Sequence, residues 1–194
     1  IRAALSYGVP NFIFSSTAAV YGERKDCLFG HLNENLPKNA FSVYGKTKQM
    51  VEEVLSGVTD MNVMCLRYFN ACGRNVEANL YEEHDPETHL IPLLARNNAA
   101  TIYGTDWPTK DGTCIRDYVH VVDICKAHLL AYEYMDNKYI HTNDVLNVGS
   151  GKGYSVKEVV DKANTIIHNG EMVVRVADRR DGDVAYLVAD TDKI

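Results

Sequence analysis

The chain has 194 residues, of which 46% are hydrophobic and 24% charged, and its formal net charge is −6. These values lie close to the average for globular domains and exclude a disordered tail, a collagen-like repeat and a low-complexity segment. A negatively charged chain repels the phosphates of nucleic acids, so we expect no nucleic-acid partner. No apolar run approaches the roughly 18 residues of a membrane span, so we expect no membrane partner.

The cysteine and histidine spacings predict neither disulfides nor a metal site. The five cysteines are odd in number, dispersed and without a Cys-x-x-Cys pair, which is typical of free thiols in a reducing compartment. We therefore expect a cytoplasmic protein. His84 and His89 stand five residues apart and would lie on different faces of a helix, so we expect no metal pair there.

Apolar periodicity predicts alternating strands and helices. In chain order we expect a helix end before Gly8, a strand over 11–15, a helix over 42–55, a buried strand over 62–67, a helix over 90–98, a strand over 101–103, a helix over 121–135, a buried strand over 144–148, a helix from 156 to 169 and a strand over 172–176. This alternation implies an α/β fold with a doubly wound parallel (Rossmann-type) sheet. Such sheets bind ligands at the carboxyl ends of their strands.

A glycine-rich turn, Gly149-Ser-Gly151-Lys-Gly153, follows one predicted strand and precedes a helix opened by a Ser155/Glu158 capping box. This is the context of a dinucleotide fingerprint, but Tyr154 stands where the third glycine is required. We interpret the segment as a tight strand-to-helix turn and not as a phosphate cradle.

Tyrosine and lysine recur at a spacing of four in three places: Tyr21/Lys25, Tyr44/Lys48 and Tyr134/Lys138. Only Tyr44/Lys48 opens a strong helix after a strand that ends in hydroxyls, the last of which is Thr17. A free phenol has a pKa of about 10, and an ammonium one turn away favours the phenolate. Such a site can remove a proton from an alcohol while hydride leaves its carbon. The spacing alone favours the plainer interpretation, a solvated pair on the helix surface.

Five motifs in register resemble those of the extended short-chain dehydrogenase/reductases, and among these the UDP-glucose 4-epimerase family. They are Phe14-Ser-Ser-Thr-Ala-Ala-Val-Tyr-Gly22, Tyr44-Gly-Lys-Thr-Lys48, Leu66-Arg-Tyr-Phe-Asn70, Asp111-Gly-Thr-Cys-Ile-Arg-Asp-Tyr-Val-His120 and Arg179-Arg-Asp-Gly-Asp183. The resemblance implies an NAD cofactor, a UDP-sugar substrate and a homodimer. It implies 4-epimerisation of a UDP-hexose through a 4-keto intermediate, with Tyr44 as base, Lys48 on the nicotinamide ribose and Thr17 as the bridging hydroxyl.

The same resemblance implies further binding residues. Tyr68 and Phe69 would line the cofactor site, and Asn70 would bind a diphosphate or sugar oxygen. The uridine would lie against His89, Leu90, Thr101 and Tyr103, the diphosphate against Arg116 and Arg180, and the ribose hydroxyls against Asp183.

The resemblance also divides the chain. Residues 1–72 would form the C-terminal part of the NAD-binding Rossmann domain, to which 121–150 returns. Residues 73–120 and 151–194 would form an incomplete UDP-sugar lobe. Because the family's glycine-rich NAD loop belongs before Ile1 and the family continues beyond Ile194, we expect a fragment that is inactive by itself.

Other functions remain open at this point. A 4-epimerase of UDP-pentoses or N-acetylated UDP-hexoses is one, because Leu187 does not decide the size of the sugar pocket. A 4,6-dehydratase would carry Asp-Glu after Thr17, where Ala18-Ala19 stand. A non-catalytic dinucleotide-binding protein is a further alternative. In such a protein we would expect the catalytic triad of Thr17, Tyr44 and Lys48 to be incomplete, whereas all three residues are present.

Overall fold

The computed structural model describes residues 1–24, 30–136 and 141–194. Its elements in chain order are α1 (Arg2–Ser6), β1 (Asn11–Thr17), the 3₁₀ helix η1 (Ala18–Val20), α2 (Val43–Ser56), β2 (Asn62–Tyr68), β3 (Asn70–Cys72), α3 (Leu90–Arg96), β4 (Ala99–Tyr103), β5 (Ile115–His120), α4 (Val121–Met135), β6 (Asn143–Val148), β7 (Gly153–Ser155), α5 (Val156–Ile167), β8 (Val173–Ala177) and β9 (Tyr186–Leu187). Every helix and strand that we expected from periodicity is present, with boundaries shifted by at most three residues.

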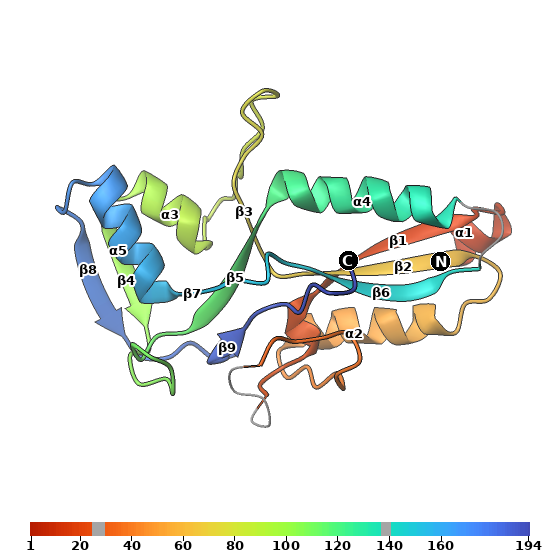
Figure 1. Cartoon of the computed structure of the whole chain (residues 1–194), viewed down its shortest axis with the longest axis horizontal. Helices are drawn as coiled ribbons and strands as arrows, with labels where there is room; N and C mark the ends of the chain where they lie inside the picture. The colour runs from red at the N-terminus through yellow and green to blue at the C-terminus, as the bar shows by residue number, and fades with distance from the viewer. Residues whose placement is uncertain (25–29, 137–140) are drawn as a thin grey trace.

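A parallel three-stranded sheet, in the order β1-β2-β6, forms one end of the molecule. Helix α4 covers one face of this sheet and α2 covers the other (Figure 1). Both crossovers therefore run through helices, as parallel neighbours require. The α/β class and the parallel sheet predicted from the sequence are confirmed.

The central strand β2 supplies the core of both faces. Val63 and Cys65 pack among the residues that face α2, and Met64 and Leu66 pack among those that face α4. Because successive side chains of a strand point to opposite faces, a strand covered on both sides reads as a continuous apolar run. The prediction of a strand buried on both faces is confirmed.

Helix α2 presents only part of its apolar pattern to the sheet. Ser42 caps its first turn by accepting a hydrogen bond from the Gly45 N–H, and Leu55 is fully buried. Met50 and Val54, which share the 3.6-residue pattern, are 64% and 59% exposed. The side chain that α2 does bury beside Leu55 is the carboxylate of Glu52, which periodicity did not predict.

The other end of the molecule combines a four-stranded sheet and a two-stranded sheet (Figure 1). Strand β5 pairs with β3 and β9 in parallel and with β7 antiparallel, while β4 and β8 form a parallel pair against which α3 and α5 pack. We did not predict β3, β5, β7 and β9. Three of them have three residues or fewer, and Arg116 and Asp117 interrupt the apolar pattern of β5.

A buried polar network joins the strands of the parallel sheet to α2. Arg67 donates to both carboxylate oxygens of Glu52, at 2.9 and 2.7 Å, and Ser16 donates to the same carboxylate at 2.5 Å. Arg67 also donates to Tyr21 Oη at 2.9 Å, and Tyr21 donates to Asn147 Oδ1 at 2.7 Å. The network links the carboxyl ends of β1, β2 and β6, where ligands of such sheets bind.

The glycine-rich turn after β6 is occupied by a carboxylate of the protein itself. Asp117, fully buried on β5, accepts hydrogen bonds from the backbone N–H groups of Ser150, Gly151 and Ala189. A Cβ atom at Gly149 would lie 2.6 Å from Asp117 Oδ2, so glycine is needed for this close approach. The backbone donors that a phosphate would require are therefore already used, which agrees with our interpretation of a structural turn.

We expect Asp117→Ala to lower the free energy of unfolding by at least about 2 kcal/mol, because it leaves several buried N–H groups without an acceptor. Asp117→Asn should cost less, because its amide oxygen can still accept from Ser150. Urea denaturation followed by circular dichroism measures both values. Equal stability of wild type and Asp117→Ala would contradict this role.

No helix in the described part of the chain has the length and apolar character of a membrane span. The thiols of Cys65, Cys72, Cys114 and Cys125 are free, and Cys27 lies outside the described residues. Burial raises the pKa of Cys65 to about 12, so this thiol stays protonated. Lys25 and Lys138, of the two other Tyr–Lys spacings, also lie outside the described residues.

Candidate functional site

Two adjoining cavities lie where β1 and β2 end and the second group of strands begins. The first, which we term the tyrosine cavity, has a volume of about 690 Å³ and is lined by Thr17, Tyr44, Tyr68 and Phe69 among others. The second, the arginine cavity, has a volume of about 490 Å³ and contains Arg116 and Arg180. Both are lined by Asn70, Ala71 and His89, so together they can hold an extended ligand.

Local backbone geometry brings Tyr44 and Thr17 to the tyrosine cavity. Thr17 ends β1 and caps η1, with its Oγ1 accepting from the Ala19 N–H at 3.2 Å. A Cβ atom at Gly45 would lie 2.7 Å from the Ala19 carbonyl oxygen, so only glycine lets α2 approach η1 this closely. Tyr44, the preceding residue, is 56% exposed and lines the cavity beside Thr17.

Lys48 is anchored to the strand and is not a freely solvated partner of Tyr44. Its Nζ donates to the Ser15 carbonyl oxygen at 2.8 Å and lies 5.0 Å from the centre of the Phe14 ring. The same ammonium lies 5.8 Å from the centre of the Tyr44 ring, within the range of a cation–π contact. Lys48 is the one member of the predicted triad that does not line the tyrosine cavity.

Tyr68 and Phe69 border the same cavity from β2. Tyr68 Oη lies 2.8 Å from Ser15 Oγ and 2.7 Å from His128 Nε2, and burial raises the pKa of Tyr68, so its phenol stays protonated. Phe69 is largely buried and packs in the core formed around Tyr21 and Leu32. These contacts hold both aromatic rings in place before any ligand binds.

The arginine cavity gathers all the residues for which the resemblance implied substrate contacts. These are Asn70, His89, Leu90, Thr101, Tyr103, Arg116, Arg180 and Asp183. They come from β3, α3 and the residue before it, β4, β5 and the loop after β8, so their meeting is a property of the tertiary structure. Leu187 does not line either cavity and packs instead in the core beside Ala189.

Two arginines share one aspartate in this cavity. Asp183 accepts from Arg116 Nη2 at 3.3 Å and from Arg180 Nε at 3.0 Å. Arg116 is 11% exposed and also donates to the Val184 carbonyl oxygen, whereas the more exposed Arg180 lies over the Tyr103 ring at 4.9 Å. One carboxylate against two guanidinium groups leaves a positive charge, which suits a diphosphate. Asp183 itself orients the two arginines.

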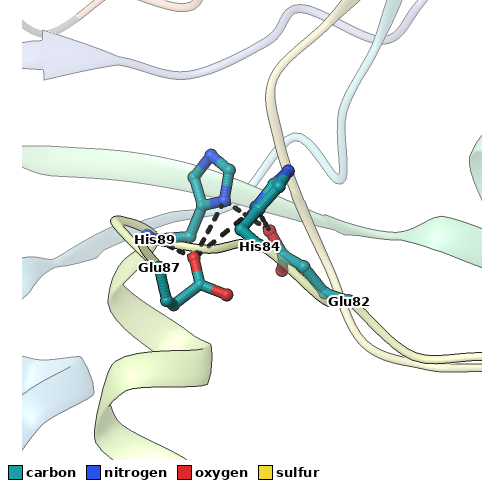
Figure 2. A group of neighbouring side chains, drawn as sticks. All are labelled: Glu82, His84, Glu87 and His89. Carbon is teal, nitrogen blue, oxygen red and sulfur yellow. Dashed lines mark hydrogen bonds and ion pairs between the residues drawn. The ribbon is translucent and has the colours of Figure 1, made fainter.

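The sequence argument about His84 and His89 was wrong in its premise, because the segment that precedes α3 is not helical. The two imidazole rings lie 4.9 Å apart, and both Nδ1 atoms face the carboxylates of Glu82 and Glu87 (Figure 2). His89 thus takes part in a side-chain cluster as well as lining both cavities. We did not predict this cluster from the sequence. We also did not predict the hydrogen bonds between Asp117 and the glycine-rich turn.

The parallel sheet, its crossover helices and the paired cavities at the strand ends are those of an α/β protein that binds its ligand at the carboxyl edge of the sheet. Residues 1–149 match the model of the NAD dependent epimerase/dehydratase family, and the chain belongs to that family.

Similar proteins and structures agree with this assignment. The UDP-glucose 4-epimerases of Halalkalibacterium halodurans and Rhizobium meliloti are 36% and 38% identical to the chain over its whole length. The chain spans 58% and 60% of these two proteins.

Two solved structures extend the comparison. The Stenotrophomonas maltophila UDP-glucose-4-epimerase, with bound NAD and formylated UDP-arabinopyranose, is 34% identical, with a TM-score of 0.86 over 97% of this chain and 57% of that one. The Bifidobacterium longum UDP-glucose 4-epimerase, in complex with NAD⁺ and UDP, is 31% identical, with a TM-score of 0.84 over 99% of this chain and 58% of that one.

Proposed function

We propose that the full-length protein is an NAD-dependent 4-epimerase that interconverts UDP-glucose and UDP-galactose. The observation that carries this proposal is the convergence of the eight substrate residues on the arginine cavity, next to the cavity that holds Thr17 and Tyr44. A uridine diphosphate in the arginine cavity would extend its sugar past Asn70 into the tyrosine cavity. We further propose the division inferred from the sequence, with 1–72 and 121–150 on the cofactor side and 73–120 and 151–194 on the nucleotide side.

The residues of the tyrosine cavity, together with the neighbouring Lys48, suit a nicotinamide and its ribose. Lys48 offers an ammonium held by the Ser15 carbonyl, Thr17 and Tyr44 offer hydroxyls, and Tyr68 and Phe69 offer rigid aromatic surface. When bound there, NAD supplies the acceptor and donor of hydride. Tyr44 would remove the proton of the sugar 4-hydroxyl, assisted by the Thr17 hydroxyl, and return it after the 4-keto sugar has turned over.

Activity of the full-length protein tests this proposal directly. With NAD⁺ present, UDP-galactose should be converted to UDP-glucose, detected by a coupled UDP-glucose dehydrogenase assay. Formation of a 4-keto-6-deoxy sugar would instead indicate a dehydratase. The small buried side chain of Ala18, next to Thr17, offers no acid for that elimination. No turnover of either hexose would refute the proposal, and preference for a UDP-pentose or an N-acetylated sugar would correct its substrate.

We expect Arg180→Ala to weaken UDP binding by about 10- to 100-fold, because it removes a charge-assisted contact worth about 1.5–3 kcal/mol. The neighbouring Arg179→Ala is the matched control. Arg179 lies over the Trp107 ring at 3.9 Å and binds Asp106, outside the arginine cavity. Calorimetric titration with UDP measures both dissociation constants, and an equal effect of the two substitutions would contradict the assignment of Arg180.

We also propose a homodimer that forms through α2. The exposed apolar side chains of Met50 and Val54 lie on the side of this helix that does not pack on the sheet. A second copy would remove this apolar surface from water.

A further inference from the structure

A compact cluster of four potential metal ligands lies in the segment between β3 and α3. Glu82, His84, Glu87 and His89 each offer one ligand atom, and these atoms all lie within 4.8 Å of one another. Figure 2 shows both imidazole rings and both carboxylates turned toward a common centre. All four residues come from eight consecutive positions, so one short segment contributes the whole set.

Three of the four distances between an imidazole Nδ1 and a carboxylate oxygen are close to those between two ligands of one ion. Glu87 Oε1 lies 3.6 Å from His84 Nδ1 and 3.5 Å from His89 Nδ1, too far for hydrogen bonds. His84 Nδ1 lies 3.2 Å from Glu82 Oε1, and His89 Nδ1 contacts the same oxygen. Tetrahedral ligands at about 2.0–2.1 Å from a zinc ion are separated from each other by about 3.3–3.4 Å.

The Glu87 carboxylate is the least exposed side chain of the cluster. Its Oε1 accepts hydrogen bonds from the backbone N–H groups of Thr88 at 2.8 Å and His89 at 2.9 Å. The Glu87 side chain is only 7% exposed, and its Oε2 has no hydrogen-bond partner among the described residues. Arg96 Nη1 lies 3.9 Å from Glu87 Oε2, which is too far for a hydrogen bond.

We propose that Glu82, His84, Glu87 and His89 bind one divalent transition-metal ion of the zinc type. Two imidazoles and two carboxylates favour such an ion over Mg²⁺, which prefers oxygen ligands and retains its water. The ion joins the two ends of the segment 82–89. Because Glu82 lines the tyrosine cavity and His89 lines both cavities, the bound ion fixes this segment at the junction of the two. This role is positional.

Metal titration of the full-length protein tests the proposal without any substrate. After removal of metals by chelation and dialysis, Zn²⁺ is added in competition with a chromophoric chelator at neutral pH. We expect one site per chain whose affinity falls at least about tenfold in Glu82→Gln and in His84→Gln. The matched controls are Glu83→Gln, at the adjacent glutamate, and His31→Gln, at an exposed histidine outside the cluster; both should bind Zn²⁺ as the wild type does. Circular dichroism verifies that every variant is folded.

A second measurement locates the effect. Hydrogen exchange of the backbone amides of residues 80–92 should slow when Zn²⁺ is added to the wild type, and should not change in His84→Gln. Absence of a stoichiometric site in the wild type would overturn the proposal. Affinity that is unchanged in both cluster variants, or lost equally in the controls, would overturn it as well.

Discussion

Tyr44→Phe should reduce turnover of UDP-galactose by about 10²- to 10⁴-fold, the usual contribution of a positioned general base. The substitution removes a single oxygen from a side chain that is more than half exposed, so the fold should be retained. Tyr44 lines the tyrosine cavity and not the arginine cavity, so the affinity for UDP should stay at its wild-type value. Steady-state assays of the full-length protein and calorimetric titration with UDP measure these two quantities.

The matched control is Tyr7→Phe, at an exposed tyrosine that lines neither cavity. Its turnover and its affinity for UDP should both equal those of the wild type. Turnover of Tyr44→Phe within a few-fold of the wild type would refute the assignment of Tyr44 as the base. A parallel loss of UDP affinity would indicate that the substitution disturbs binding instead of proton transfer.

Arg67→Met should lower the free energy of unfolding by about 3–5 kcal/mol, the cost of leaving one member of a buried ion pair without its partner. Arg67 is 3% exposed, and it supplies two of the hydrogen bonds that the Glu52 carboxylate accepts. The double variant Arg67→Met/Glu52→Leu should recover part of the loss, because no buried charge then remains unpaired. Urea denaturation with matched spectroscopic probes gives all three values.

The exposed pair Lys157–Asp161 on α5 provides the control, and Asp161→Asn should cost less than about 1 kcal/mol. If Arg67→Met costs no more than this control, the buried network does not stabilise the fold. The pH dependence offers an independent check. Burial raises the pKa of Glu52, but the hydrogen bonds from Arg67 and Ser16 outweigh it and hold the pKa below its usual value.

A carboxyl whose pKa is lower in the folded state stabilises the protein fully above its unfolded pKa, which is about 4.3 for glutamate. That stabilisation is lost as the pH falls from this value through the lower folded pKa. The difference in unfolding free energy between the wild type and Glu52→Gln should therefore be constant near neutral pH and shrink below about pH 4. A difference that grows on acidification would contradict the lowered pKa.

Periodicity identified those helices and strands in which a single apolar pattern runs through the whole element. The buried strand β2 and the helix α4 lie where the apolar residues placed them, because their side chains pack on the nearest layer. The short strands β3, β7 and β9 and the polar strand β5 were missed, since their pairing depends on partners far away in the chain. Likewise, the burial of Glu52 depends on Arg67, 15 residues later, and not on its own position in the helical pattern.

By itself, the sequence determined the α/β class, the order of the main helices and strands, and the motif residues Thr17, Tyr44 and Lys48 at the end of β1 and the start of α2. These features depend on local periodicity, capping and turn chemistry, which act over a few residues. Only the tertiary structure decided that Asp117 fills the glycine turn and that Asp183 orients both Arg116 and Arg180. It also decided that Glu82, His84, Glu87 and His89 face one another. Except for the four-residue cluster and the Arg180–Asp183 pair, these contacts join segments that are distant in the chain. All of them depend on backbone directions that residue spacing alone does not specify.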